Sequence, residues 1–429
     1  MSSAGNDEPP APPPLEGPSK GRSRSAARWL LRMLRLIGVN VAVGVVLLEG
    51  GLRLAGLDPG RVWEPDPELG WRHVPGERRR WREEGDALVV INSEGRRDRE
   101  RPAEKPADVY RIGFFGDSMT EGVQVDLEQT FAYRLEERLR GRTSRPVEVL
   151  NFGVNGYGPA QEYLLFRREG PRHRPDLVVV GVFADNDVAD SAPELRSGEG
   201  WCPFPVLDGE KLAFDFSRAE QSFADYHREP FYSLRKRSAI YRVASEWRGR
   251  RRTLAAAAPP DGRQAGAGPQ GDPTWVPKRY RLYRKPLSPE WERAWTATER
   301  VLEEFAAEAG RQQARFAIIS LPAGQVVQSH AWATLVRTYP AMGQGEWDLE
   351  GPNRRLEAFA LERGYPLLRT QAAFREAASS SGPPLFFGDI GHLTPRGHEV
   401  MADLLERFVR DHDLVPGLGG PVRGGDAGR

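Results

Sequence analysis

Three residues that lie far apart in the sequence, Ser118, Asp389 and His392, could together provide a nucleophile, an orienting acid and a base. A serine hydroxyl is unreactive at neutral pH unless an adjacent imidazole takes its proton, and the imidazole works well only when a third group fixes its tautomer. We therefore predict a catalytic triad. In it, Ser118 attacks, His392 takes the proton, and Asp389 accepts a hydrogen bond from the other ring nitrogen.

The residues before Ser118 predict how the serine is positioned. Residues 109–115 read Val-Tyr-Arg-Ile-Gly-Phe-Phe, which is typical of a buried strand. Gly116 and Gly122 permit a tight turn where this strand passes into a helix. Such a turn would present Ser118 at the carboxyl edge of a parallel sheet, where α/β proteins keep their sites.

Two further polar blocks each follow a strand-like run. Residues 151–156 read Asn-Phe-Gly-Val-Asn-Gly and come after the run 147–150. Residues 184–187 read Ala-Asp-Asn-Asp and come after the apolar run 177–183. Each block alone is ordinary turn chemistry. Their order, together with the terminal Asp/His pair, favours an active site over coincidence.

These blocks resemble, in order, the four blocks of the SGNH, or GDSL-type, hydrolase family, which includes membrane-anchored bacterial members. The resemblance covers roughly residues 107–412. The chain departs from the usual pattern at two positions, because Met119 stands where leucine or isoleucine is commoner and Ala184 replaces a glycine. The resemblance implies a three-layer α/β/α fold, of the flavodoxin-like kind, around a parallel sheet.

The resemblance also implies an oxyanion hole formed by Ser118, Gly156 and Asn186. The donors would be the backbone N–H groups of Ser118 and Gly156 and the side-chain amide of Asn186. Donors already aimed at the oxygen on which charge develops lower the barrier. Gly153 is the alternative to Gly156.

No metal or other cofactor is expected. A metal cluster could be suggested by Asp117, Asp185 and Asp187, but their spacing matches no EF-hand pattern. Their side chains can instead form hydrogen bonds that stabilise turns. His398 lies on a helix that is expected to begin near Pro395, and we assign it a structural role.

Strands that alternate with helices predict a parallel sheet that is covered on both faces. Further strands are expected at 317–322 and 365–368, and a helix with apolar spacing at 291–309. The region from about 190 to 290 lacks clear sheet periodicity and is interpreted as an irregular insertion. Residues 413–429 are expected to form a flexible tail.

The insertion contains two segments of biased composition. A basic stretch at 235–252 could touch anionic lipid or polysaccharide, although a solvated helix face is the favoured interpretation. An Ala/Pro/Gly-rich stretch at 255–273 is expected to form a flexible loop.

The N-terminus predicts a membrane anchor. Residues 1–28 should be a disordered tail, rich in Pro, Ser and Gly at its start. Five arginines precede the uncharged apolar run 36–48, namely Arg22, Arg24, Arg28, Arg32 and Arg35. Positive charge before an apolar run predicts a cytoplasmic N-terminus and an exported remainder. Residues 29–57 are long enough to span a bilayer. We favour an uncleaved anchor over a cleaved signal peptide or a buried amphipathic helix.

Residues 58–106, called the lead-in segment below, contain alternating and β-branched runs that indicate short strands. Asn92, Arg96 and Arg97 are candidates for the rim of the site. A structural collar around the main domain is the simpler interpretation of the segment.

Composition limits the classes of function. A chain of 429 residues with 39% hydrophobic and 28% charged residues can bury at least one large core. A net charge of +1 gives no overall field that would favour nucleic acid. Cys202 is the single cysteine, so the chain forms no internal disulfide, and cysteine usage says little about compartment.

Together these features predict a membrane-anchored serine esterase whose catalytic domain is periplasmic or extracellular. Its expected substrate is a small acyl ester or an acylated glycan of the cell envelope, with acetyl as the candidate acyl group. An O-acyltransferase is the alternative chemistry. A non-catalytic glycan-binding or scaffold protein is the alternative of another class, but intact Ser118, Asn186 and His392 argue against it. No protein partner is predicted.

Overall fold

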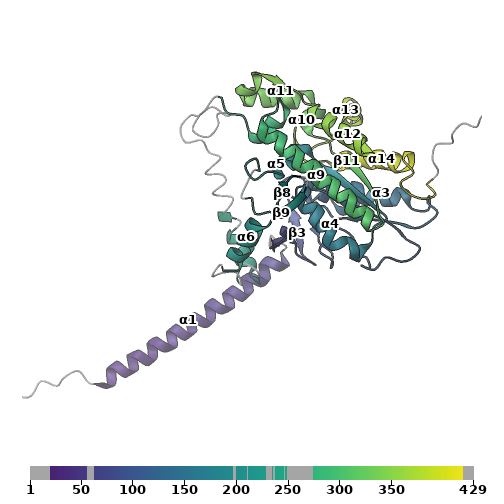
Figure 1. Ribbon diagram of the computed structural model, residues 1–429. Coiled ribbons are helices and arrows are strands. Elements are labelled where there is room, and N and C mark those ends of the chain that lie inside the picture. Colours follow the sequence, from purple (N-terminus) through teal and green to yellow (C-terminus); the bar gives the residue numbers. More distant parts are fainter. Residues whose placement is uncertain are drawn as a thin grey trace, which may run out of the picture.

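The computed structural model describes residues 20–55, 62–196, 200–209, 211–228, 234, 237–245, 247–248 and 274–418 (Figure 1). Three predictions lie wholly or mainly outside these residues: the disordered start of the chain, the flexible loop at 255–273, and most of the tail at 413–429. The described parts of the two tails differ from their predictions, because residues 20–28 are helical and Leu414, Val415 and Leu418 are buried in the core. The basic stretch at 235–252 is described only in part.

A five-stranded parallel sheet forms the centre of the chain. Its strands are β5 (Tyr110–Phe115), β6 (Val147–Asn151), β7 (Leu177–Val182), β11 (Arg315–Ser320) and β13 (Leu367–Arg369). They lie in the order β13-β11-β7-β5-β6, and every neighbouring pair is parallel. The predicted strands at 109–115, 147–150, 177–183, 317–322 and 365–368 all fall on this sheet.

Each central strand is buried on both faces, which explains its continuous apolar sequence. Along β7, Val178 and Val180 belong to one hydrophobic cluster, and Leu177 and Val179 belong to another. Successive side chains of a strand point to opposite faces, so the two clusters are the two sides of the sheet.

Helices cover both faces (Figure 1). On the first face, α4 (Pro159–His173), α9 (Pro289–Arg311) and α12 (Gly351–Arg363) supply apolar side chains to the first cluster. On the second face, α3 (Phe131–Leu139), α13 (Gln371–Ser379) and α14 (Pro395–Asp411) supply the other. The α/β/α prediction is therefore correct, including the helix expected at 291–309.

The insertion is less irregular than expected. It contains the antiparallel hairpin β8 (Phe204–Asp208) and β9 (Lys211–Asp215), followed by α6 (Ser217–Arg228). Much of β9 is exposed, so its side chains carry little of the alternation by which a half-buried strand is recognised. Further along, η3 (Lys278–Tyr283) leads through β10 (Arg284–Lys285) to α9, and β10 pairs with β12 (Glu346–Trp347). The short helices α10 (Gly324–Val327), α11 (Ser329–Thr338) and η4 (Pro340–Gly343) precede β12.

The lead-in segment forms two antiparallel hairpins. The first pairs β1 (Trp63–Asp66) with β2 (Gly70–His73), and the second pairs β3 (Arg78–Trp81) with β4 (Ala87–Val90). Between the second hairpin and β5, Asn92 accepts hydrogen bonds from the backbone N–H groups of Glu94 and Arg96, which fixes a tight turn.

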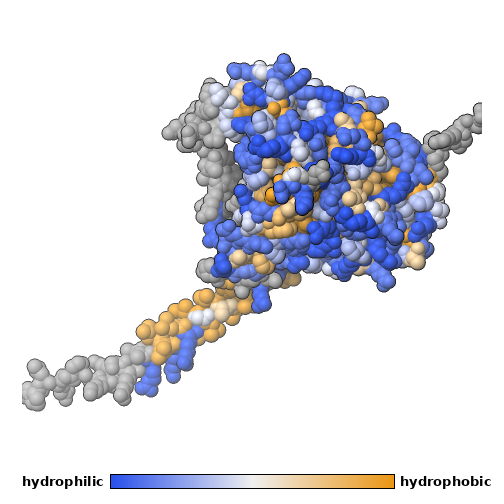
Figure 2. All heavy atoms as spheres, in the orientation of Figure 1, coloured by the Kyte–Doolittle hydropathy of each residue, from blue (hydrophilic) through white to orange (hydrophobic). Residues whose placement is uncertain are grey.

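The helix α1 (Lys20–Leu54) extends away from the rest of the described chain (Figure 1). Its part Arg28–Leu54 is long and apolar enough to cross a membrane and is not buried against the protein. Figure 2 shows this exposed apolar surface as a continuous band. A buried amphipathic helix is therefore excluded for this segment.

The C-terminal end of α1, which lies next to the rest of the protein, contacts the insertion. The Glu49 carboxylate accepts hydrogen bonds from the backbone N–H groups of Ala239 and Ile240, at 2.7 and 3.1 Å. Arg53 donates to the carbonyl oxygen of Arg237 at 2.6 Å. Part of the basic stretch therefore lies at the end of the apolar helix.

His398 is fully buried on α14, in agreement with the structural role predicted for it. Its Nδ1 accepts a hydrogen bond from the backbone N–H of Phe131, at the start of α3, at 3.2 Å. Burial, reinforced by the positive charge of Arg97, lowers the pKa of His398 to about 3. The ring is therefore neutral in the folded protein at physiological pH.

We expect His398 to make folding sensitive to acid. Its folded pKa lies below the unfolded value, so its contribution is complete above pH 6.5 and is lost as the pH falls toward the folded pKa of about 3. At pH 5 the loss should be about 2 kcal/mol. His398→Asn keeps an acceptor but does not titrate between pH 5 and pH 7, so the free energy of unfolding of this variant in urea should fall less between pH 7 and pH 5. The exposed His412→Asn serves as the control. Equal pH slopes for wild type and His398→Asn would contradict this role.

Candidate active site

Ser118 stands at the sharp turn that follows β5. It begins the short helix α2 (Ser118–Glu121), and Asp117 before it accepts a hydrogen bond from the backbone N–H of Met119 at 2.9 Å. A Cβ atom on Gly116 would lie 2.2 Å from the Thr120 hydroxyl, so only glycine fits there. Gly122 ends the helix with φ of +67°, in the left-handed region that glycine adopts without strain.

His392 lies beside this serine. Its Nε2 atom is 2.8 Å from the Ser118 hydroxyl oxygen, which is hydrogen-bond distance. The imidazole sits in a turn just before α14, closed by a hydrogen bond from the Phe387 N–H to the His392 carbonyl oxygen at 2.8 Å. The structure thus brings together the two residues that the sequence predicted as nucleophile and base.

The structure does not place the predicted acid, Asp389, at the imidazole. The Asp389 side chain is exposed and faces α11, where one of its oxygens lies 3.3 Å from His330 Nε2. The other ring nitrogen of His392, Nδ1, instead contacts the carboxylate of Glu84. Glu84 also accepts a hydrogen bond from the backbone N–H of His392 at 2.9 Å. Although Asp389 is only three residues before His392, its side chain does not reach the imidazole, because the tight turn between Phe387 and His392 directs the aspartate toward solvent.

Glu84 belongs to the lead-in segment, at the tip of the β3–β4 hairpin. Partial burial opposes its ionisation, but the hydrogen bonds from His392 outweigh this effect and hold the pKa of Glu84 below its usual value. A Cβ on the following Gly85, whose φ is +75°, would lie 2.1 Å from the carbonyl oxygen of Gln124. The hairpin tip is therefore docked closely against the loop after α2.

No sequence signal marked Glu84 as part of the site. It stands in the polar run Glu-Glu-Gly-Asp at 83–86, which is typical of any hairpin turn. Its partner His392 is 308 residues away in the chain. Only the docking of the hairpin against the main domain reveals the pair.

The two candidate oxyanion glycines have different surroundings. The Gly153 N–H donates to the Asn151 side chain at 2.9 Å, and a Cβ there would lie 2.4 Å from the backbone nitrogen of Glu121. Gly153 is thus a packing position whose N–H is already used. In the described part of the chain, the Gly156 N–H donates to no protein atom. Gly156 has φ of +76°.

Asn186 lies on α5 (Ala184–Asp190), directly after β7. Its side-chain amide donates to the Asp117 carboxylate at 2.9 Å. Asp117 is fully buried, and burial raises the pKa of its carboxyl group. The aspartate before the nucleophile therefore fixes the asparagine beside it.

Ser118, Asn186 and His392 line one cavity of about 250 Å³. Met119, Phe183 and Ile390 are among its apolar walls. Arg279, on η3, reaches the same cavity from the end of the insertion.

The acidic residues near this cavity are held separately. Asp185 contacts the Tyr283 hydroxyl and the Gln325 amide, and burial raises its pKa. Asp187 accepts from the Phe183 N–H at 2.7 Å. Burial, reinforced by repulsion from the neighbouring Glu162, raises the pKa of Asp187 well above its usual value. Within the described residues, no group of three or more His, Cys, Asp or Glu side chains is arranged to hold a metal ion.

The lead-in segment also holds the loop that carries Gly156. Glu121, on α2, contacts His73 Nε2 at 2.7 Å and accepts from the Asn155 N–H at 2.6 Å. Trp71 Nε1 donates to the Asn155 carbonyl oxygen at 3.0 Å. Two lead-in side chains thus position the residue just before Gly156.

The three residues proposed for the rim do not line the cavity. Asn92 forms its turn, Arg96 contacts His173 at 2.8 Å, and Arg97 donates to the carbonyl oxygens of Glu121 and Gly122 at 2.9 and 2.6 Å. Arg97 therefore holds the C-terminal end of α2, the short helix that begins with Ser118.

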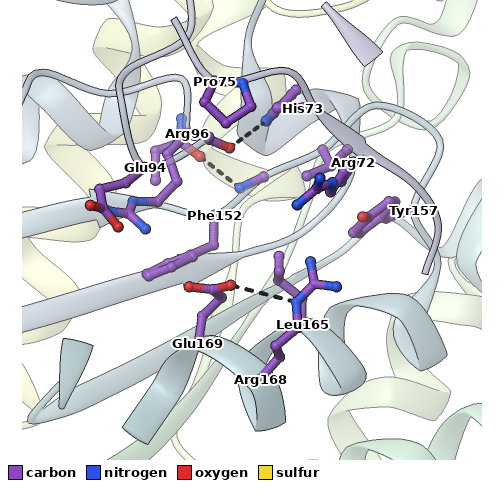
Figure 3. A pocket seen from close by; sticks show the side chains of 14 residues that line it. Arg72, His73, Pro75, Glu94, Arg96, Phe152, Tyr157, Leu165, Arg168 and Glu169 are labelled. Carbon is purple, nitrogen blue, oxygen red and sulfur yellow. Dashed lines mark hydrogen bonds and ion pairs between the residues drawn. The ribbon is translucent and has the colours of Figure 1, made fainter. Parts of the chain in front are cut away.

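A separate, small cavity of about 70 Å³ lies between the lead-in segment and α4 (Figure 3). Charged side chains from both partners meet there, including Arg72 and Arg96 from the lead-in segment and Arg168 and Glu169 from α4. Neither Ser118 nor His392 lines it. Its size suits water molecules that solvate a polar contact surface.

The model of the GDSL-like lipase/acylhydrolase family matches residues 114–400, about two thirds of the chain. The chain belongs to this family. As a GDSL-like member it is a hydrolase that acts on ester bonds, in agreement with the resemblance drawn from the four sequence blocks.

No curated protein matches the chain of this GDSL-like hydrolase by sequence. Among solved structures it is similar to Axe2, an acetylxylan esterase from Geobacillus stearothermophilus, at 12% identity over 70% of this chain and 94% of that one, with a TM-score of 0.36. It is also similar to LAE5, an alpha/beta hydrolase enzyme from the metagenome of Lake Arreo, at 13% identity over 72% and 97%, with a TM-score of 0.34. At this level neither similarity says anything about the substrate of this chain.

The contact between Glu84 and His392 predicts a matched pair of variants. Glu84→Gln should lower kcat for a small ester by about 10² to 10⁴-fold, because the amide no longer stabilises the imidazolium or fixes its tautomer. Asp389→Asn should leave kcat within about twofold, since surface changes away from a site have small effects. The kcat of each folded variant is measured by steady-state hydrolysis of the ester. A large loss in Asp389→Asn with little loss in Glu84→Gln would return the acid role to Asp389.

Proposed function

We propose that the protein is a serine esterase that removes a short acyl group from a carbohydrate or other cell-envelope ester through an acyl-serine intermediate. The observation that carries the proposal is the 2.8 Å contact between the Ser118 hydroxyl and His392 Nε2, with Glu84 on the opposite ring nitrogen. This is the arrangement by which a weak nucleophile is activated.

In the first half of the reaction, Ser118 Oγ forms a bond to the ester carbonyl carbon while His392 Nε2 takes the hydroxyl proton. The bond between that carbon and the alcohol oxygen then breaks, and His392 gives the proton to the departing alcohol. In the second half, water attacks the acyl-serine by the same route, releasing the acid and restoring Ser118. Glu84 stays ionised throughout and stabilises the imidazolium.

The carbonyl oxygen becomes negative in both halves. The proposed donors to it are the backbone N–H groups of Ser118 and Gly156 and the side-chain amide of Asn186, each worth about 3 kcal/mol of barrier. Two observations support this set: the N–H of Gly153 is already used, and the carboxylate of Asp117 holds the Asn186 amide.

The proposed acyl group is short, with acetyl as the candidate. The cavity at Ser118 has a volume of about 250 Å³ and is lined by both apolar and charged residues. A long acyl chain would need a larger apolar space. The acceptor in the second half is water in this proposal; a sugar hydroxyl in its place would make the protein an O-acyltransferase.

The nucleophile can be tested directly. Ser118→Ala should abolish hydrolysis of p-nitrophenyl acetate and labelling by a fluorophosphonate, because the variant lacks the oxygen that becomes acylated. Ser379→Ala, which changes an exposed serine at the end of α13, is the control and should keep both. Adding acetylated oligosaccharide with an unacetylated acceptor, and analysing products by mass spectrometry, separates release of acetate from its transfer. Undiminished hydrolysis by Ser118→Ala would refute the proposed nucleophile.

The proposed location is the outer face of a membrane, with α1 as an uncleaved anchor. Support comes from the arginines before the apolar run and from the exposed apolar surface of Arg28–Leu54. Such an arrangement would place the catalytic residues among cell-envelope esters.

Topology can be tested with a reporter enzyme that is active only outside the bacterial cytoplasm, fused after α14. The reporter should be active, and the full-length protein should stay with membranes after a carbonate wash. Replacing Arg28, Arg32 and Arg35 by alanine should lower reporter activity, because these charges hold the N-terminus inside. A shortened soluble product would indicate a cleaved signal peptide, and an inactive reporter on the wild-type chain would refute an envelope substrate.

A further inference from the structure

The catalytic cavity contains a cation that the proposed reaction does not use. Arg279, on η3, lines this cavity of about 250 Å³ together with Ser118 and His392. A guanidinium group stays charged at any physiological pH. Hydrolysis of an uncharged acetyl ester needs no such charge here, because the proposed donors to the carbonyl oxygen are Ser118, Gly156 and Asn186.

Arg279 has no carboxylate partner among the described residues. Its guanidinium carbon lies 4.9 Å from the centre of the Tyr280 ring, and the group also interacts with the hydroxyl of this tyrosine. Within the described part of the chain it forms no ion pair, and its side chain is exposed. A guanidinium that lies on an aromatic face keeps N–H groups at its edge, and these match the two oxygens of a carboxylate.

The other charged side chains of the cavity already have partners. The three aspartates are held as described above: Asp117 by Met119 and Asn186, Asp185 by Tyr283 and Gln325, and Asp190 by Arg196. His392 contacts Glu84. Burial raises the pKa of all three aspartates, which disfavours negative charge on them. Arg279 attracts Asp185, but the two side chains form no ion pair. The charge of Arg279 is therefore not neutralised by a carboxylate in direct contact.

The turn that carries Arg279 is ordered by its neighbours. Val276 before it and Tyr280 after it are buried in one hydrophobic cluster, against which Ile390 of the cavity wall also packs. The Tyr280 N–H donates to the Pro277 carbonyl oxygen at 3.1 Å. A cation on an ordered turn loses less entropy when it binds a ligand than one on a mobile loop.

The ligand group that fits this cation is a carboxylate. It carries one charge and presents two coplanar oxygens to the planar guanidinium. A phosphate monoester carries more charge than one arginine beside three aspartates can balance. We propose that Arg279 is a specificity-determining residue, which binds a carboxylate of the ester substrate while Ser118 attacks the ester carbonyl. The proposal rests on the proposed function, because it assigns a further group to the same substrate.

Either half of the ester can carry this carboxylate. In the acyl half, it would belong to a dicarboxylic acid that is esterified at one end, such as succinic acid. In the alcohol half, it would belong to an acylated uronic acid. Both substrates bring the same group to Arg279, and the experiment separates them.

Two pairs of esters test the contact, each with one charged and one uncharged member of the same shape. For the alcohol half, 4-acetoxybenzoate is compared with 4-acetoxybenzamide. For the acyl half, monoethyl succinate is compared with ethyl succinamate. The full-length chain in lipid nanodiscs is assayed with each, and kcat/KM for the charged ester is divided by kcat/KM for the uncharged one. Arg279→Gln should lower this ratio at least about fivefold for one pair, mainly through KM, because charge-assisted hydrogen bonds are lost.

Two further variants separate a contact from a general effect. Arg279→Lys keeps the charge and should recover part of the ratio, although it lacks the planar fork. Lys278→Gln is the control, because Lys278 donates to the carbonyl oxygen of Glu194 at 3.0 Å and does not line the cavity. It removes one positive charge from the adjacent residue, and its ratio should equal that of the wild type. A merely structural role of Arg279 would change both members of a pair by the same factor.

Binding is also measured without turnover, by ligand-observed NMR on Ser118→Ala. Adding Arg279→Gln to this background should raise the Kd of the preferred charged ester at least about fivefold. Unchanged ratios in Arg279→Gln for both pairs, an unchanged Kd, or an equal fall of the ratio in Lys278→Gln would each overturn the proposal. Hydrolysis by the wild type without any effect of Arg279 on the ratio would refute the carboxylate site and leave the esterase. Binding that depends on Arg279, without hydrolysis by the wild type, would do the reverse.

Discussion

The contact between Glu84 and His392 is the interaction on which the arrangement of the site depends. An imidazole in a turn before a helix can rotate and can carry its proton on either nitrogen. The Glu84 carboxylate removes both freedoms, because it binds Nδ1 and the backbone N–H of the same residue. It can do so only if the β3–β4 hairpin is docked on the main domain. The fit of Gly85 against Gln124 and the hydrogen bonds from Arg97 to the loop after β5 both contribute to that docking.

The parallel sheet accounts for the rest of the site. Ser118 and Asn186 follow the neighbouring strands β5 and β7, so the carboxyl ends of these strands bring them together. The buried Asp117 then joins the two residues by a hydrogen bond. Further carboxylic acids are buried around α5, and the raised pKa values of Asp187 and Glu162 show that this region disfavours charge.

The sequence was sufficient for the sheet and for two of the three residues Ser118, His392 and Glu84. Strands buried on both faces leave continuous apolar runs, and Ser118 and His392 each stand in a block of recognisable composition. Glu84 could not be found in this way, because a hairpin docks through shape and a few polar contacts that no periodicity records. The position of the Asp389 side chain was not predicted for a related reason: spacing along the chain limits the distance between two residues but not the direction of a side chain. The β8–β9 hairpin was missed because its exposed side chains leave little pattern.

Glu84 also bears on where this protein can be divided. The match to the family begins at residue 114, thirty residues after Glu84. A fragment that begins just before β5, close to the family boundary, would keep the whole sheet, the serine and the histidine, and yet would lack the Glu84 carboxylate that contacts the histidine. The segment that matches the family is therefore shorter than the segment that contains all the residues around His392. An exchange of the family-matched domain between this chain and another protein would need to carry the preceding β3–β4 hairpin with it.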